Sequence, residues 1–307
     1  MKFPLLAALF ATGLCAADPI VIAHRGASGY LPEHTLEAYA FAYAQGAHFI
    51  EPDLVMTRDR RFICLHDIHL ESTTDVEAKF PHRKRPDGRW YAADFTLDEI
   101  RELAVHERLD NRFPRDHAGF QIPTLREMIE LVQGLNQTLG KNVGIYPELK
   151  APSFHAKEGL PMERAIVDVL RSYGYDMADA AVFVQCFEME PLQRIRDLGA
   201  EFPTVMLIGN GEQARRLMTQ DGLKDLARFA NGIGPAKRLV ERNPAVVGWA
   251  HKLGLVVHPY TMRADDYPTD RYDSFEDELR KFYYAYKVDG VFTDFPDRVL
   301  SVLDEGP

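Results

Sequence analysis

Short apolar runs alternate with amphipathic stretches along most of this 307-residue chain. The apolar runs predict nine strands: Ile20–His24, Phe49–Met56, Phe62–His66, Val143–Leu149, Val182–Phe187, Pro203–Ile208, Gly232–Gly234, Leu255–Tyr260 and Gly290–Thr293. The stretches between them predict helices that include Thr35–Gln45, Leu125–Leu135, Glu163–Tyr173, Pro191–Leu198 and Asp273–Tyr286. Such alternation is typical of a parallel α/β sheet, and at this length it predicts a (β/α)8 barrel of the TIM type.

Two features predict a distorted barrel. Nine strands compete for eight places, and the link from Thr57 to Arg61 is too short for a parallel crossover. The second and third strands should therefore form a hairpin-like unit, with one of the nine strands outside the barrel. A long stretch follows the third strand and contains the capping box Thr96–Glu99, before a second capping box, Thr124–Glu127, opens a helix. We expect an insertion over about residues 70–121 that covers one end of the barrel.

The N-terminus has the pattern of a secretion signal. Lys2 precedes an apolar run from Phe3 to Leu14, and the small residues Ala16 and Ala17 follow. The run of about 12 residues is too short to span a bilayer. We therefore expect a signal peptide over residues 1–17 and a mature domain over 18–307 that is periplasmic or secreted, without a stable membrane anchor. Lipid attachment at Cys15 is an alternative that Leu14 disfavours.

Charge and cysteine content limit the function further. The formal net charge is −10, which argues against a nucleic-acid partner, so an anionic substrate would need local cations or a metal ion. Outside the signal, only Cys64 and Cys186 remain. Both lie in predicted strands with another strand between them, which places them too far apart for a disulfide. We expect two buried free thiols.

Ionisable residues gather at the ends of four predicted strands. These groups are His24-Arg25, Glu51-Pro52-Asp53, His66-Asp67 and Glu148-Leu149-Lys150. Because the carboxyl ends of barrel strands line the active-site face, we expect all four groups to converge there.

The carboxylates suggest a metal site. The two-residue period of a strand sends Glu51 and Asp53 to the same face, and Glu148 could add a third carboxylate. A hard divalent cation prefers oxygen ligands and would offset their repulsion. A metal-free network of ion pairs with Arg25 and Lys150 is the alternative.

The remaining groups suit phosphodiester chemistry. His24 and His66 could move protons near neutral pH, to and from the attacking and leaving oxygens. Arg25 could form a bidentate contact with phosphoryl oxygens, while Lys150 would act as a point charge. Glu33 is expected either to pair with Arg25 or to cap the following helix.

The order and spacing of these groups resemble the signature of the glycerophosphodiester phosphodiesterase family, in its exported bacterial branch. The similarity extends through further segments of the mature chain: AHRGASGYLPEHTLEAYAFAYAQGA, LVMTRDRRFICLHD, FTLDEI, GKNVGIYPELKAP, QCF, GIGP, VVHPYT and GVFTDFPD. Pro52 departs from the pattern, because a polar residue is expected between the two acids.

The resemblance implies an activity: metal-dependent hydrolysis of small-molecule glycerophosphodiesters to sn-glycerol 3-phosphate and an alcohol, by His acid–base catalysis through a cyclic phosphate. It implies His24 and His66 as catalytic residues and a divalent cation, Ca²⁺ or alternatively Mg²⁺, as cofactor. Its metal ligands and phosphate contacts would be Glu51, Asp53, Glu148, Arg25 and Lys150. Strand-end positions add Gln185, Phe187 and Tyr260 as substrate contacts, and a homodimer is left open.

Three other functions remain to be separated from this one. A related barrel could act on another diester such as a lysophospholipid or sphingomyelin. An amidohydrolase is disfavoured because the first strand lacks a His-x-His pair. A pure binding protein is disfavoured because it would not need ionisable groups at four strand ends.

Overall fold

The computed structural model describes residues 18–117 and 119–307, so the predicted signal segment 1–17 lies outside the described residues. The strands are β1 (Ile20–His24), β2 (Phe49–Glu51), β3 (Asp53–Met56), β4 (Phe62–Cys64), β5 (Gly144–Ile145), β6 (Glu148–Leu149), β7 (Val184–Cys186), β8 (Thr204–Ile208), β9 (Gly232–Pro235), β10 (Val256–Val257) and β11 (Gly290–Thr293). Two predicted strands are interrupted: Pro52 separates β2 from β3, and Tyr146-Pro147 separates β5 from β6. Proline has no amide hydrogen to donate to a ladder, which accounts for a break at each site.

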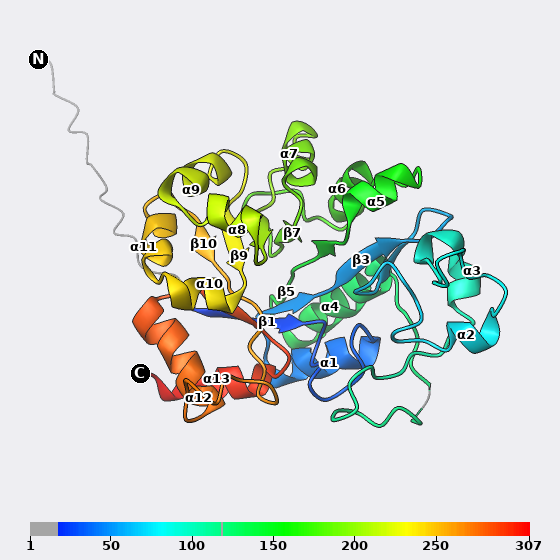
Figure 1. The fold of residues 1–307 in the computed structure, drawn as a ribbon, viewed down its shortest axis with the longest axis horizontal. Coiled ribbons are helices and arrows are strands. Elements are labelled where there is room, and N and C mark those ends of the chain that lie inside the picture. The colour runs from blue at the N-terminus through cyan, green and yellow to red at the C-terminus, as the bar shows by residue number, and fades with distance from the viewer. Residues whose placement is uncertain (1–17, 118) are drawn as a thin grey trace, which may run out of the picture.

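The strands form the ring of a distorted (β/α)8 barrel. Counting β2–β3 and β5–β6 as one barrel strand each, the parallel order is β11, β1, β2–β3, β5–β6, β7, β8, β9 and β10. Single backbone hydrogen bonds join β10 to β11: the Asp289 amide donates to the Val257 carbonyl (3.1 Å) and the Phe292 amide to the Pro259 carbonyl (3.0 Å). Figure 1 shows these strands at the centre of the molecule with helices around them.

Strand β4 is the ninth strand and lies outside the ring. It pairs antiparallel with β3, with Leu54 opposite Cys64 and Met56 opposite Phe62. This confirms the hairpin-like unit predicted from the short Thr57–Arg61 link. Because β4 runs back toward the start of β3, the residues that follow it return to the barrel mouth. His66 therefore does not follow the carboxyl end of a parallel strand, as the sequence had predicted, although the hairpin brings it to the same place.

The helices follow the predicted pattern with small shifts at their ends. Those around the ring are α1 (Leu36–Gln45), α4 (Leu125–Leu139), α5 (Pro152–Lys157), α6 (Glu163–Ser172), α7 (Met189–Asp197), α8 (Glu212–Leu217), α9 (Gln220–Leu226), α10 (Lys237–Arg242), α11 (Ala245–His251), α12 (Phe275–Arg280), the π-helical turn η2 (Lys281–Tyr286) and α13 (Pro296–Glu305). Both predicted capping boxes form, at Thr96 and at Thr124. In each, the threonine hydroxyl accepts from the N3 amide, and the N3 glutamate accepts from the threonine amide.

A second apolar cluster supports the segment that follows β4. This segment contains α2 (Val76–Lys79), the 3-10 turn η1 (Ala92–Asp94) and α3 (Leu97–Ile100). Its buried side chains, among them Trp90 and Phe95, pack on Val55 of β3 and Ile63 of β4. In Figure 1 the segment lies beside β3, at one end of the ring of strands. The hairpin therefore connects the barrel core to this separate cluster.

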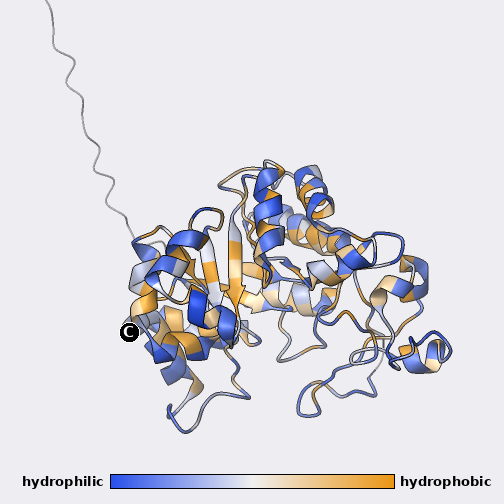
Figure 2. Ribbon diagram, turned by 45° about the horizontal axis from the view of Figure 1, so that its top comes forward, coloured by the Kyte–Doolittle hydropathy of each residue, from blue (hydrophilic) through white to orange (hydrophobic). Residues whose placement is uncertain are grey.

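Hydropathy along the ribbon agrees with this layering. Figure 2 shows hydrophobic colours on the central strands and many hydrophilic positions on the surrounding helices. Cys64 and Cys186 are buried and free, as predicted. None of the helices among the described residues is long and apolar enough to cross a membrane.

Candidate active site

One cavity at the barrel mouth collects most of the predicted site residues. It has a volume of about 210 Å³. Nine of the ten predicted residues line it: His24, Arg25, Glu51, His66, Glu148, Lys150, Gln185, Phe187 and Tyr260. The tenth, Asp53, does not line the cavity but forms ion pairs with Arg25 and Lys150, which do. Segments that are far apart in the sequence therefore meet at one concave, strongly ionisable site.

Three buried carboxylates form the floor of the site. Glu51, Asp53 and Glu148 each place one carboxylate oxygen within 4.8 Å of the others. Asp53 and Glu148 are directly opposite each other in the β3–β6 register, which explains their proximity. Burial and the neighbouring carboxylates raise the pKa of Glu51 well above its usual range. Burial also raises the pKa of Glu148 to about 8. Burial, which penalises the charged form, is the largest cause of both upward shifts, and in Glu51 the charges of Asp53 and Glu148 add to it.

Two cations pair with these acids. Lys150 Nζ lies 2.7 Å from Glu148 Oε1 and 3.6 Å from Asp53 Oδ1. Arg25 Nε lies 3.2 Å from Asp53 Oδ2, and the Arg25 amide donates to Glu51 Oε2 at 2.7 Å. The ion-pair network that the sequence left as an alternative is therefore present. These ion pairs are compatible with a metal site, because one oxygen of each of the three carboxylates still lies within 4.8 Å of the others.

Glu33 fixes the guanidinium of Arg25. Arg25 Nη1 donates to Glu33 Oε2 at 2.9 Å, and Arg108 Nε lies 3.0 Å from the same oxygen. Although burial opposes ionisation, these two arginines lower the pKa of Glu33 to about 2. Of the two roles considered for Glu33, the structure shows charge pairing; the cap of α1 is instead the Thr35 hydroxyl, which accepts from the Ala38 amide.

His24 is oriented by a buried aspartate. Its Nδ1 donates to Asp294 Oδ1 at 2.6 Å, and Asp294 also accepts from Arg112 Nη2 at 2.7 Å. Arg263 Nε lies 2.9 Å from Asp294 Oδ2. The two arginines and His24 hold the pKa of Asp294 below its usual range despite burial. Burial and the charge of Arg25 lower the pKa of His24 to about 4, so its ring is neutral near pH 7.

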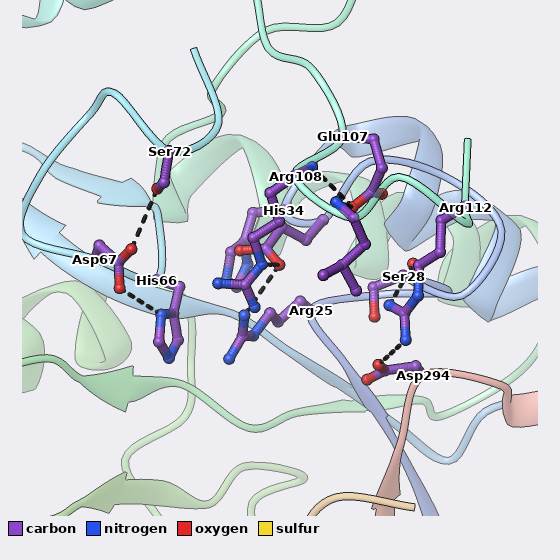
Figure 3. Close-up of polar contacts among 12 residues, drawn as sticks. Arg25, Ser28, His34, His66, Asp67, Ser72, Glu107, Arg108, Arg112 and Asp294 are labelled. Atoms are coloured by element: carbon purple, nitrogen blue, oxygen red, sulfur yellow. Dashed lines mark hydrogen bonds and ion pairs between the residues drawn. The ribbon is translucent and has the colours of Figure 1, made fainter. Parts of the chain in front are cut away.

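His66 has a similar but more exposed arrangement. Its Nδ1 donates to Asp67 Oδ1 at 2.7 Å, while the Ser72 hydroxyl donates to Asp67 Oδ2 at 3.1 Å. Burial and Arg25 lower the pKa of His66. In both histidines the Nδ1 contact leaves Nε2 free for a substrate in the cavity. Figure 3 shows the His66–Asp67 pair on one side of Arg25 and Asp294 on the other.

One segment beyond the barrel contributes contacts to the site that the sequence did not indicate. Arg108 contacts Glu33, and the guanidinium of Arg112 donates to the Ser28 carbonyl (3.0 Å), to Asp265 (2.9 Å) and to Asp294. Figure 3 shows both arginines reaching toward Arg25 and Asp294 from this segment. The sequence likewise did not indicate that Asp294 orients His24. These contacts cross 75 to 182 residues, and no local spacing in the sequence indicates them.

The three predicted substrate contacts lie along one wall. Gln185 Nε2 donates to Glu51 Oε1 at 3.0 Å, so this residue also orients a carboxylate. The Phe187 ring lies 5.8 Å from that of Tyr260 in an edge-to-face contact, and Lys150 Nζ is 5.7 Å from the Phe187 centroid. The Tyr260 hydroxyl donates to the Ile208 carbonyl at 3.2 Å. The wall thus presents an aromatic surface beside the charged floor.

The donor set fits a hard divalent cation. Glu51, Asp53 and Glu148 provide anionic oxygens at one point, and burial makes their mutual repulsion costly without a further positive charge. Beside the three carboxylates, His24 and His66 could transfer protons, and two cationic side chains could bind an anionic group. This combination suits hydrolysis of a phosphate ester, with the reacting phosphorus between the carboxylate floor and the histidines.

Comparison with known proteins gives concordant results. A model of the glycerophosphoryl diester phosphodiesterase family matches residues 24–298. A glycerophosphodiester phosphodiesterase of Haemophilus influenzae is 37% identical over 94% of this chain and 90% of its own. Another from Treponema pallidum is 33% identical over 94% of this chain and 93% of its own.

Solved structures show the same fold. A Silicibacter pomeroyi protein of the same family name superimposes with a TM-score of 0.76 at 26% identity, over 94% of each chain. An Oleispira antarctica phosphodiesterase, solved in complex with the product sn-glycerol-3-phosphate, gives a TM-score of 0.68 at 23% identity, over 93% of this chain and 97% of its own.

Proposed function

The chain belongs to the glycerophosphoryl diester phosphodiesterase family of enzymes, and from that premise we propose that it hydrolyses small glycerophosphodiesters to sn-glycerol 3-phosphate and an alcohol. The observation that carries this proposal is the single cavity in which two carboxylate-bound histidines face three clustered acids and two cations. The product bound to the Oleispira antarctica relative supports the same chemistry.

The two histidines account for the proton transfers. The substrate's own glycerol hydroxyl attacks phosphorus, one imidazole takes its proton, and the bond from phosphorus to the alcohol oxygen breaks. The other histidine protonates that leaving oxygen. Water then opens the cyclic phosphate with the two roles reversed. Each histidine has the required Nε2 free, because Asp294 and Asp67 accept from the two Nδ1 atoms.

Positive groups hold the phosphate during these steps. Arg25 is fixed by Glu33 and Asp53, so its guanidinium is preorganised beside the cavity. Lys150 adds a second charge next to Phe187 and Glu148. Glu51, Asp53 and Glu148 would hold a divalent cation, most consistent with Ca²⁺, with Mg²⁺ as the alternative. When bound, the cation supplies Lewis-acid neutralisation of charge on the phosphoryl oxygens.

Hydrolysis of glycerophosphocholine by purified residues 18–307 tests the proposal. We expect release of sn-glycerol 3-phosphate, its loss with EDTA, and its recovery on adding Ca²⁺ or Mg²⁺. Parallel assays with lysophosphatidylcholine and sphingomyelin distinguish the rival diesters. Absence of sn-glycerol 3-phosphate at every cation tested would refute the activity, and full activity in EDTA would refute the metal requirement.

Export is a separate part of the proposal. It rests on the charged residue, apolar run and small residues within positions 1–17. We expect a fusion of residues 1–25 to a periplasm-dependent reporter such as alkaline phosphatase to be active in a bacterial host. A cytoplasmic, uncleaved fusion would contradict it. Radiolabelled palmitate incorporation, compared between wild type and Cys15→Ser, tests the lipid-anchor alternative.

A further inference from the structure

A second, larger cavity adjoins the reaction cavity. It has a volume of about 970 Å³, and Tyr260, Thr261 and Arg263 line both cavities. The reaction cavity alone, at about 210 Å³, lies below the roughly 300–1,000 Å³ of cavities that enclose whole ligands. It can hold a glycerol phosphate unit, whereas the alcohol of a larger diester must extend outside it. We call the larger cavity the side groove.

The side groove is basic in a chain that is acidic overall. Six arginine or lysine side chains line it against three acids, although the chain carries a net charge of −10. Three of the cations have acidic partners: Lys237 Nζ lies 2.8 Å from Glu278, Arg271 pairs with Glu241, and Arg263 pairs with Asp294.

The other three cations remain available to a ligand. Among the described residues, Arg238, Arg242 and Lys281 form no ion pair, and Asp266 is the one lining acid without a cationic partner. Arg238 and Arg242 are four residues apart on α10 and therefore share one face of the helix. The groove thus presents a net positive charge that its own acids do not cancel.

We infer that the side groove binds the leaving alcohol of the substrate and favours an alcohol that carries a further phosphate group. This inference rests on the proposed function and specifies its substrate class. A second phosphate would meet Arg238, Arg242 and Lys281 while the scissile phosphate occupies the reaction cavity. The quaternary ammonium of choline would instead meet uncompensated positive charge. Steering by such a groove raises association rates by about 10–10³-fold and weakens as salt increases.

The experiment compares three substrates at low and at physiological salt. They are glycerophosphoglycerol, the same diester with a phosphate on its second glycerol, and glycerophosphocholine. We expect wild-type kcat/KM to be highest for the phosphate-bearing diester and to fall as salt rises. In the double variant Arg238→Gln/Arg242→Gln, kcat/KM for that diester should fall about tenfold, while kcat/KM for glycerophosphocholine should rise.

A matched control removes two exposed cations that do not line the groove, in Arg228→Gln/Lys252→Gln. In this control, the ratio of kcat/KM for the phosphate-bearing diester to kcat/KM for glycerophosphocholine should remain as in wild type. The opposite signs expected for the two substrates separate a charge effect from a folding defect, which would lower both rates. The inference would be overturned if the Arg238→Gln/Arg242→Gln variant lost kcat/KM equally on all substrates or kept the wild-type ratio. It would also be overturned if the wild-type enzyme preferred glycerophosphocholine. In each case the hydrolytic activity itself would still stand. Failure to hydrolyse any of the three would instead refute the proposed function and, with it, this inference.

Discussion

Replacing Asp294 by asparagine tests how the barrel orients His24. The carboxylate accepts the His24 Nδ1 hydrogen at 2.6 Å and is itself held by Arg112 and Arg263. Asparagine keeps the shape but can present an amide donor to Nδ1. The ring would then carry its hydrogen on Nε2, the atom that faces the substrate, and could no longer accept a proton there.

The expected loss follows from two contributions. A hydrogen bond to a charged group contributes about 1.5–3 kcal/mol, which corresponds to about 10- to 150-fold in rate. The wrong tautomer adds to this, and the analogous exchange in a Ser-His-Asp triad costs about 10⁴-fold. We therefore expect kcat to fall by about 10²–10⁴-fold. Since Asp294 raises the pKa of His24, its loss should also move the limb of the kcat/KM profile that reports His24 to lower pH.

The assay is steady-state release of sn-glycerol 3-phosphate across pH, with thermal unfolding to verify the fold. The downfield proton resonance of His24 Nδ1–H should disappear from the NMR spectrum of the variant. Asp297→Asn is a matched control, because this nearby aspartate contacts Tyr30 and does not line the reaction cavity. A folded Asp294→Asn enzyme with kcat within threefold of wild type would refute the reasoning.

Three further predictions concern the other groups of the site. His24→Ala and His66→Ala should each lower kcat by about 10²–10⁴-fold with little change in the thermal midpoint; near-normal turnover in either would show that its imidazole does not transfer the proton. Glu51→Gln should raise the divalent-cation concentration needed for half-maximal activity more than tenfold, and excess cation should partly restore the rate; an unchanged cation dependence would favour a purely ion-paired role. Because the pKa of Glu33 is lowered from 4.5 to about 2, its ion pair with Arg25 stabilises the fold above pH 4.5 and is lost as pH falls toward 2. Urea unfolding of Glu33→Gln should therefore show a loss on the order of 3 kcal/mol at pH 7 that disappears by pH 2; a pH-independent difference would contradict this.

Local patterns in the sequence predicted the barrel strands and many of its helices. Short apolar runs identify buried parallel strands, because both faces of such a strand are buried. This signal persists where Pro52 interrupts the ladder, since burial does not depend on the hydrogen bond that proline cannot donate. The capping box at Thr124 fixed the start of α4 to the residue. Helix starts without such a signal were placed less accurately, as in α7, which begins at Met189 although the sequence predicted Pro191.

Contacts between distant segments could not be predicted in the same way. The barrel geometry itself brings Glu51, Asp53 and Glu148 together, since strand order and register fix their places. The positions of Arg108 and Arg112 depend instead on how an irregular segment returns over the barrel mouth. An arginine in such a segment has the same local sequence signature whether it is solvated or paired with a buried aspartate.

The balance of charge at the floor of the site links metal binding to substrate binding. Three carboxylates face two cations, Arg25 and Lys150, so with all three acids ionised, as binding a cation requires, the group by itself carries a net charge of about −1. Burial raises the pKa of Glu148 to about 8, so near pH 7 a bound cation would have to displace its proton. A divalent cation would reverse the sign to about +1, and the same walls would then attract the phosphate. On this reasoning, substrate affinity should depend on cation concentration even in a variant whose chemistry is blocked, such as His66→Ala. Calorimetric titration of that variant with glycerophosphoglycerol should therefore detect binding with Ca²⁺ and lose it with EDTA, whereas equal affinity under both conditions would show that the cation is not needed to bind the phosphate.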